Sequence, residues 1–486
     1  MVWSFALVAL VFGCGGSAAK PTRPDIAAPG EYPGLRFVPA RPTYAFAARS
    51  VREAQRGFGD LADTFGLPVD VDRVRLGGEL RGMFGVDPLS PEAVAEIGID
   101  LDGGIAVFSA ATDPTFVVHL AAPAETTAFL DRRRAQAPKT QSVVIDGSEI
   151  FSARIAGSVG ISWTVDRDWL WVHFAFGADP EDTSWFTARN QPATPSWTAD
   201  WAWASGTTAS PSVLGFVDVR ALLGKLSSRI ATARACVSLV EPVSRVAVAV
   251  EARSGGRVAA KLALDVGPSS AALRKAILPA PEGFASVASG APVSAQWNLD
   301  LTYALAALRP CMTAFGHDVA AIESYGIRSA RIALRSIEPG ALKGTGVVMA
   351  DLASKRHVAG LLDQIPFRSR FEDKKQFGPF TGRHLSVPMV PDVDYVLTDQ
   401  VAFAAIGDGL LARAVGSGKP VTGGPILAID LVPGAMPAAS WTYLLELAEV
   451  PRAARIVEGL ARWRDLHFGA TLDGSRLVVE ASGNRR

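Results

Sequence analysis

The sequence predicts an α+β fold made of two tandem, internally duplicated units of mainly antiparallel sheet with packed helices. Three observations predict it. The chain of 486 residues is too long for one ordinary hydrophobic core, and its 49% hydrophobic content is enough to form more than one. Segments with alternating apolar residues, typical of half-buried strands, are interspersed with helical patterns. Similar stretches also recur in the same order in the two halves.

The clearest repeat is a hairpin pattern. The segment "VGISWTVDRDWLWVHFAFG" (159–177) resembles "PDVDYVLTDQVAFAAIGDG" (391–409), which follows 232 residues later. Both alternate apolar and polar residues up to a polar tip and then resume, as expected of a β-hairpin. Three further pairs of similar segments flank it: 115–133 with 345–364, 212–226 with 425–438, and 246–264 with 466–482. We therefore expect a first unit at 37–267 and a second at 283–486, joined by a linker at 268–282.

Helix starts inside the first unit are predicted from capping residues. Ser50 and Glu53 form a capping box at the start of an amphipathic segment. Ser90 and Pro91 predict a second, short helix, which Gly98 ends. Because the hairpins imply antiparallel pairing, α+β is favoured over a doubly wound parallel sheet.

A tryptophan-rich stretch, "PSWTADWAWASG", is the most unusual part of the first unit. From Gly177 to Asp218 the chain runs 41 residues, whereas the matching Gly409 and Asp430 are 21 apart. The extra material is expected near 187–209. Its residues Trp197, Trp201 and Trp203 predict either a flap that packs on the hairpin holding Trp163, Trp169 and Trp171, or an aromatic platform for a ligand or partner.

The N-terminus has the pattern of an export signal. Residues 1–14 form a short apolar run that is too short to span a bilayer. Its end, Val11-Phe12-Gly13-Cys14, resembles the lipobox of bacterial lipoproteins, which implies that Cys14 is lipidated and becomes the first mature residue. The alternative is an ordinary signal peptide with an incidental cysteine. The Pro-rich residues 15–42 are expected to form a tether, and the resemblance implies that Gly15 favours the outer membrane over the inner one.

Cysteine usage and charge narrow the class of protein. Besides Cys14 the chain has only Cys236 and Cys311, an even pair that predicts either a disulfide in an oxidising compartment or two buried thiols. Lys plus Arg equals Asp plus Glu, at 48 each. This balance gives no basic surface, so no nucleic-acid partner is expected.

Catalytic and metal-binding patterns are missing from the sequence. The six histidines include no His-x-x-x-His pair, and there is no Gly-x-Ser-x-Gly elbow. The segment "GIDLDGG" (98–104) lacks the later ligands of a calcium loop, which favours a turn. Asp218 and Asp430 are interpreted as helix caps, and His119 and His173 as structural. No catalytic residue, metal or cofactor is predicted.

As a whole, the chain resembles tandem-domain bacterial lipoproteins of unknown function. This resemblance supplies no activity. The lipid anchor, the balanced charge and the missing catalytic patterns together favour a non-enzymatic binding or scaffold module, lipid-anchored at the outer membrane of a Gram-negative cell envelope and facing the periplasm. The expected partners are the membrane, through the lipid, and a protein or glycan. Two alternatives stay open: a carrier that holds an apolar ligand between helices and sheet, and a hydrolase whose site is not visible as a motif.

Overall fold

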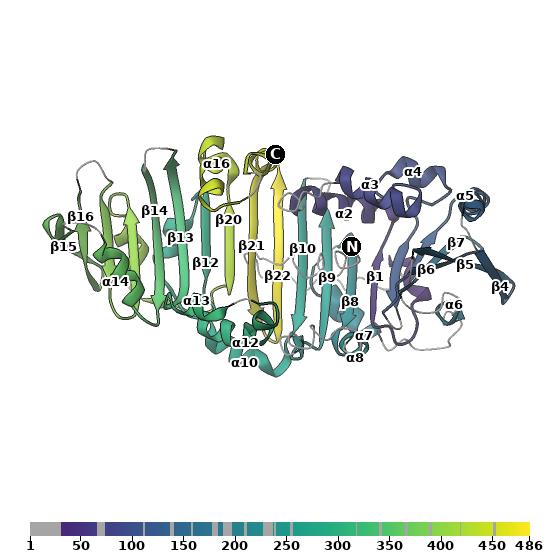
Figure 1. Cartoon of the computed structure of the whole chain (residues 1–486), viewed down its shortest axis with the longest axis horizontal. Helices are drawn as coiled ribbons and strands as arrows, with labels where there is room; N and C mark the ends of the chain where they lie inside the picture. Colours follow the sequence, from purple (N-terminus) through teal and green to yellow (C-terminus); the bar gives the residue numbers. More distant parts are fainter. Residues whose placement is uncertain are drawn as a thin grey trace. The chain divides into compact units, whose positions relative to one another are not determined.

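The computed structural model describes residues 31–65, 73–109, 112–136, 140–156, 159–176, 183–187, 197–208, 211–226, 237, 240–252, 256–316, 318–339, 343–364, 368–387, 391–417, 419–450 and 453–486. The described chain divides into two compact units. The N-terminal unit extends to residue 231 and includes 243–265, and the C-terminal unit comprises 266–486 with 232–242. The prediction of a mixed α+β fold with antiparallel strands is confirmed in both units (Figure 1).

The N-terminal unit is built on an antiparallel sheet of ten strands in the order β4-β5-β6-β7-β3-β2-β1-β8-β9-β10. The strands are β1 (Tyr44–Ala48), β2 (Ile105–Ser109), β3 (Thr115–His119), β4 (Thr140–Ile145), β5 (Ser148–Ala156), β6 (Val159–Asp166), β7 (Trp169–Phe176), β8 (Val213–Asp218), β9 (Arg245–Ala252) and β10 (Arg257–Asp265). The helices are η2 (Pro33–Phe37), α2 (Val51–Phe65), α3 (Arg73–Phe84), α4 (Pro91–Glu96), α5 (Pro123–Gln136), α6 (Ser184–Thr187), α7 (Thr198–Ser205) and α8 (Val219–Leu226). The predicted hairpin at 159–177 is β6–β7.

The two serine caps of this unit are placed as predicted, whereas the Glu53 carboxylate pairs with Arg49 instead of completing the capping box. The Ser50 hydroxyl accepts a hydrogen bond from the Glu53 amide at 3.1 Å, at the start of α2. The Ser90 hydroxyl accepts one from the Ala93 amide at 3.2 Å, at the start of α4. Gly98, with a φ of +85°, follows this helix, and a Cβ at this position would lie 2.3 Å from the Ala122 carbonyl oxygen.

Helices cover both faces of the N-terminal sheet. Because side chains alternate along a strand, neighbouring residues contribute to two cores. One core lies against α2, where Ala54 packs with Val213 and Val250. The other lies against η2 and α7, where Phe216 is almost fully buried.

The predicted tether is too long at its C-terminal end. It was expected to reach residue 42, yet Tyr32 and Leu35 are buried against the sheet. Gly34 allows this contact, since a Cβ there would lie 2.8 Å from the Cβ of Ala106. The burial of two large apolar side chains therefore holds residues 32–37 on the folded unit, and residues 1–30 lie outside the described part of the chain.

The C-terminal unit has ten strands in the antiparallel order β15-β16-β17-β18-β14-β13-β12-β20-β21-β22. They are β12 (Val293–Trp297), β13 (Ile327–Glu338), β14 (Lys343–Leu352), β15 (Glu372–Phe377), β16 (Phe380–Leu385), β17 (Val393–Leu397), β18 (Val401–Ile406), β20 (Leu427–Leu431), β21 (Trp463–Asp473) and β22 (Arg476–Arg485); the short β11 (Ala280–Pro281) pairs with β19 (Pro420–Val421). The helices are η5 (Gly267–Ser269), α10 (Ser270–Ala276), α11 (Phe284–Ala288), α12 (Leu301–Ala314), α13 (Val319–Glu323), α14 (Arg356–Asp363), η6 (Arg368–Arg370), α15 (Leu410–Val415), η7 (Pro433–Ala435), α16 (Ala438–Leu447) and α17 (Ala453–Leu460). The expected linker at 268–282 thus contains α10 and β11.

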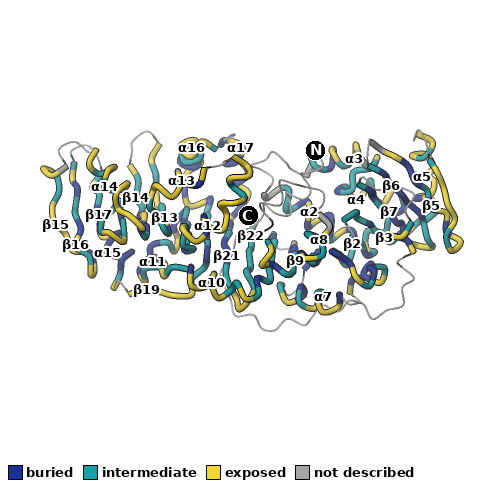
Figure 2. The backbone as a smooth tube through the Cα atoms, turned by 60° about the horizontal axis from the view of Figure 1, so that its bottom comes forward, coloured by how far each residue is buried: buried dark blue, intermediate teal, exposed yellow. Residues whose placement is uncertain are grey.

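The two faces of the C-terminal sheet differ in their covering. On one face α11 and α15 close a core that includes Ala333, Val347 and Met349. Figure 2 shows α14 on the opposite side of the sheet from α15. Because side chains alternate along each strand, Ile332 and Val348 point toward that opposite side.

Candidate functional site

The tryptophan-rich helix α7 is held against strands β8 and β9. Trp197 and Trp201 are buried, and Trp201 meets the rings of Tyr32 and Phe216 edge-on, with centroids 5.2 and 6.5 Å away. Burial raises the pKa of Tyr32 to about 12, an effect that the nearby positive charge of Arg49 opposes. Since both indoles are enclosed, neither offers a free ring face for a ligand to stack on.

Trp203 is the partly exposed member of the three. The Arg245 guanidinium lies 4.5 Å from its ring centroid and forms an ion pair of 2.9 Å with Asp200 on the same helix. Arg245 therefore fixes α7 on the edge of the core. The expected contact with the hairpin was wrong, because the hairpin residue Trp171 is covered by Phe37 and by Phe186 of α6 instead.

Histidine–carboxylate contacts occur in both units. In the N-terminal unit, His119 lies between Asp100 and Asp168, with nitrogen–oxygen distances of 2.9 and 3.1 Å. Burial pushes the pKa of Asp100 upward, but hydrogen bonds from His119 and from the backbone amides of Asp102 and Gly103 outweigh it, and the net pKa is lowered. The segment "GIDLDGG" is a turn, as predicted, and it presents Asp100, whereas Asp168 comes from the turn between β6 and β7.

His173 of the same unit is half-buried. Its Nδ1 lies 3.0 Å from the hydroxyl of the buried Thr115, and its ring stacks on Trp185 with centroids 5.1 Å apart. The contacts with a buried hydroxyl and a buried indole support a structural role for His173.

Two histidines of the C-terminal unit, His384 and His467, also contact carboxylates. His384 Nδ1 lies 2.8 Å from the buried carboxylate of Asp394, which Lys375 also contacts at 3.0 Å. His467 Nδ1 is hydrogen-bonded to Asp430. The Ser294 hydroxyl donates to Asp430 at 3.3 Å rather than to His467. This arrangement lacks the hydroxyl–imidazole contact that activates a serine nucleophile.

Asp218 and Asp430 have different roles despite their matched positions. Asp218 caps α8 by accepting a hydrogen bond of 2.9 Å from the Ala221 amide, as predicted. Asp430 lies inside β20 and caps no helix, so that interpretation was wrong. The cause is Pro433, which disfavours helical geometry at the preceding residue. Val432 accordingly has non-helical dihedral angles, with φ at −119° and ψ at 82°.

The metal-ligating side chains and the cysteines are the next candidates for a site among the described residues. Within the described ranges, no group of three or more His, Cys, Asp or Glu side chains is arranged to hold a metal ion. Cys311, on α12, is disulfide-bonded. Cys14 and Cys236, the other two cysteines, lie outside the described residues.

The C-terminal unit carries most of the exposed large apolar side chains found among the described residues. Eight of them fall between α12 and α14, and we name them the apolar surface. They are Tyr303, Leu308, Phe315, Ile322, Tyr325, Ile332, Val348 and Leu361. Figure 2 shows exposed backbone along α12, α13 and α14, the helices of this surface.

The strand residues of the apolar surface belong to an uncharged row across the sheet. Ile332 pairs with Val348, and Val348 pairs with Ala404. On the other side, Ile332 pairs with Ala295, and Ala295 pairs with Ile429. Ile332 and Val348 are 38% and 48% exposed, so this row is only partly covered.

Three side-chain contacts fix the helices of the apolar surface. Asp300 caps α12 and also pairs with Arg328 at the start of β13. Burial raises the pKa of Asp300, but the hydrogen bonds from Arg328 and the Thr302 amide outweigh it, and the pKa is lowered.

The remaining two contacts join neighbouring helices. Arg309 of α12 pairs with Glu323 of α13. Tyr325 meets the ring of His357 on α14 edge-on, with centroids 4.7 Å apart. The apolar side chains are thus displayed on elements that are linked to one another.

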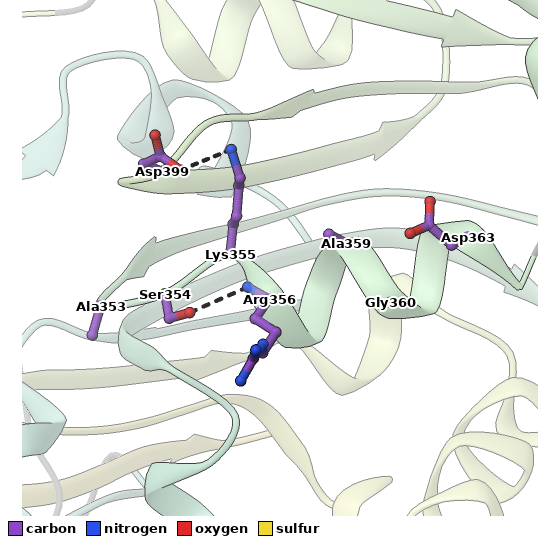
Figure 3. Close-up of a pocket in the computed structure, with 8 residues that line it drawn as sticks. All are labelled: Ala353, Ser354, Lys355, Arg356, Ala359, Gly360, Asp363 and Asp399. Atoms are coloured by element: carbon purple, nitrogen blue, oxygen red, sulfur yellow. Dashed lines mark hydrogen bonds and ion pairs between the residues drawn. The ribbon is translucent and has the colours of Figure 1, made fainter.

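An open cavity of about 520 Å³ lies at the first turn of α14 (Figure 3). Lys355 and Asp399 form an ion pair of 2.8 Å on one side of it, and the Ser354 hydroxyl accepts a hydrogen bond from the Arg356 amide. The Arg356 guanidinium points away from that ion pair and has no ion-pair partner among the described residues (Figure 3). The first turn of α14 is therefore polar, and Arg356 is its cation without an ion-pair partner among the described residues.

Sequence reasoning missed the apolar surface. A stripe of apolar residues on a helix or strand has the same pattern whether it is covered or not. The only signal was a mean hydropathy of +0.21, which the many alanines of the chain also explain. Exposure depends on which elements pack over a stripe, and that is a property of tertiary structure.

The comparisons with known proteins supply no identity. Among the described residues, no helix has the length and apolar character needed to cross a membrane. No protein-family model matches the chain, and neither a curated protein nor a solved structure is significantly similar to it.

Proposed function

We propose that this chain is a non-enzymatic, lipid-anchored envelope protein that acts as a binding or scaffold module, with the apolar surface as its contact site. The observation that carries the proposal is the exposed pair Ile332 and Val348 within an uncharged row of the sheet. Single exposed apolar residues are normal on a protein, whereas a connected group of them marks an interaction site. The aromatic members, Tyr303, Phe315 and Tyr325, are of the residue types enriched in interfaces.

The geometry of the polar groups supports binding rather than catalysis. The histidine–carboxylate contacts lie outside the apolar surface, and Ser294 bonds to a carboxylate instead of an imidazole. A protein partner would bury the apolar side chains, and the Arg356 side would face the polar rim of such an interface.

Lipid anchoring at Cys14 and export form the second part of the proposal. The disulfide of Cys311 supports an oxidising compartment, because structural disulfides are rare in the cytosol. The lipobox-like sequence and the Pro-rich segment after it favour the periplasmic side of a Gram-negative outer membrane. The partner is then an envelope protein or glycan.

We also propose that the two units arose by duplication. Their ten-stranded sheets have the same strand order. For example, β1 lies between β2 and β8 in one sheet, and β12 lies between β13 and β20 at the same position of the other. The similar segments of the sequence fall on corresponding strands. Duplication followed by divergence explains why an exposed apolar surface is found in one unit.

A photocrosslinking experiment on the full chain tests the contact site. A photoreactive residue in place of Leu361 should yield one defined crosslinked product in the cell envelope. Ile332→Lys with Val348→Lys should reduce that product at least tenfold, because charge on the row opposes its desolvation. The thermal midpoint should change little, since both side chains are already partly exposed.

Val74 of α3, which is 83% exposed, provides the matched control. A photoreactive residue there should give no such product, and Val74→Lys should leave the Leu361 product intact. The same product from both positions, or a product that survives the double lysine variant, would contradict a specific contact site at the apolar surface.

A carrier of an apolar ligand is the second candidate. The uncharged row of the sheet favours it, because acyl chains need an apolar lining without charged groups. An organic extract of the purified full chain should then contain lipid in a fixed ratio to protein, and the double lysine variant should lose it. Lipid-free protein that still forms the crosslinked product would exclude the carrier and leave the scaffold.

A further inference from the structure

The edge strand β4 of the N-terminal sheet offers a second, independent interaction surface. Among the described residues β4 pairs only with β5, in a register that joins Thr140 to Ala153 and Ile145 to Ser148. Its other side therefore carries backbone N–H and C=O groups without a strand partner. Such an edge is a ready template for another strand.

The side chains of β4 do not protect this edge. The strand reads Thr-Gln-Ser-Val-Val-Ile and has no charged residue, glycine or proline. Val143 and Val144 are 45% and 67% exposed. Because consecutive residues point to opposite faces, each face of the sheet ends in an exposed valine.

The corresponding edge of the C-terminal sheet is built differently. Strand β15 reads Glu-Asp-Lys-Lys-Gln-Phe and pairs, within the described ranges, only with β16. Four consecutive charged side chains are the usual protection of an edge strand, since pairing would desolvate them. One sheet is thus protected at this position and the other is not.

The hairpin that presents β4 has fixed local geometry. The turn residues Asp146 and Gly147 have φ angles of +50° and +82°, which is the two-residue type I′ turn that matches strand twist. The Arg134 guanidinium of α5 lies 4.5 Å from the Phe151 ring on β5, so the hairpin is also braced by a helix. The edge is therefore preformed and needs no folding on binding.

We propose that β4 pairs antiparallel with β4 of a second copy of this chain, which joins two N-terminal sheets edge to edge. A two-fold axis perpendicular to the sheet at Val143 sets Val143 opposite Val143 and Ser142 opposite Val144, because directly opposed residues point to the same face. The two Val143 side chains then meet on one face, and on the other face Val144 of one copy lies diagonal to Val144 of the other. A two-fold interface uses the same surface of both copies, so that surface must be complementary to itself. An uncharged edge strand with exposed valines satisfies this condition.

The expected affinity is modest. A six-residue strand pair is small beside the roughly 1,600 Å² of a standard stable interface. The association should therefore depend on concentration and should be favoured where copies are held in the same membrane. The proposal does not depend on the apolar surface, which lies in the other unit.

Photocrosslinking of the full chain in the cell envelope tests this pairing. A photoreactive residue in place of Gln141 should give a product of twice the chain mass, with crosslinked peptides from β4 of both copies identified by mass spectrometry. Val143→Lys with Val144→Lys should reduce this product about tenfold or more, since like charges would face each other across the new strand pair. Val144→Lys alone should give an intermediate reduction.

The matched control replaces Lys374 of β15 with the photoreactive residue, which should give no double-mass product. Circular dichroism and the thermal midpoint of the lysine variants should equal those of the parent chain, because both valines are exposed. A product of another mass would assign the edge to a different protein and overturn self-pairing. The absence of any product, or a dimer product that persists in the double lysine variant, would overturn it as well.

Discussion

Replacing Trp201 with alanine should destabilise the N-terminal unit far more than the same change at Trp203. The Trp201 ring is 1% exposed and contacts three aromatic rings, those of Tyr32, Trp197 and Phe216. Removing a large buried aromatic side chain costs about 3–5 kcal/mol, through lost burial and the cavity left behind. We expect Trp201→Ala to lie in this range.

Trp203→Ala is the matched control on the same helix. The ring is partly exposed and contacts the Arg245 guanidinium. A cation–π contact of this kind contributes about 0.5–1 kcal/mol at an exposed site, so the loss should stay near 1 kcal/mol. An aromatic platform for a ligand would show the opposite order, with little loss of stability at Trp201 and lost binding.

Urea unfolding followed by tryptophan fluorescence measures both changes. Seven tryptophans lie between Trp163 and Trp203 in the N-terminal unit and three in the C-terminal unit, so the signal reports mainly on the first. A free energy of unfolding that falls by less than about 1 kcal/mol in Trp201→Ala would refute the buried position of this ring.

Three further predictions concern other contacts. Arg331 is buried and donates hydrogen bonds to Asn298, Asp351 and the Pro279 carbonyl. Arg331→Met should therefore lower the free energy of unfolding of the C-terminal unit in urea by about 3–5 kcal/mol, because it leaves these partners unpaired. A loss below about 1 kcal/mol would contradict the network. Asp218→Ala should cost about 0.5–2 kcal/mol through the lost cap of α8, and amide exchange should accelerate in that helix but not after the control Asp430→Ala. Since the folded pKa of Asp100 is lowered, its ion pair stabilises the fold above the ordinary value of 3.8 and is lost as the pH falls below it. As the pH is lowered, the free energy of unfolding should therefore fall less in Asp100→Asn than in the parent chain. Identical pH dependence in the two proteins would refute a stabilising role of the Asp100 carboxylate.

Local sequence signals predicted the elements whose cause is local. The hairpins at 159–177 and 391–409 follow from alternation of apolar residues, which depends only on the period of a strand. The caps at Ser50, Ser90 and Asp218 follow from the need of helix N-termini for a side-chain acceptor. Asp430 failed as a cap because Pro433 changes the backbone three residues later, a signal that the sequence did contain.

Contacts between distant segments account for the rest. Tyr32 and Leu35 were assigned to a tether, yet they pack on strands more than sixty residues away in the sequence. The tryptophan helix packs on β8 and β9 rather than on the hairpin, because Phe37 and Phe186 already cover Trp171. Proline content and aromatic content describe a segment, but they do not say which surface is left for it to cover.

The sequence by itself determined the α+β class, the hairpins, the main helix caps and the absence of a recognisable catalytic motif, because each depends on residues close together in the chain. Only the tertiary structure decided that Trp201 is enclosed, that Ile332 and Val348 are partly uncovered, and that β4 ends its sheet without charges. Periodicity fixes which residues share a face or an edge. Whether that face or edge is buried depends on what packs against it, and this is settled by elements far away in the sequence.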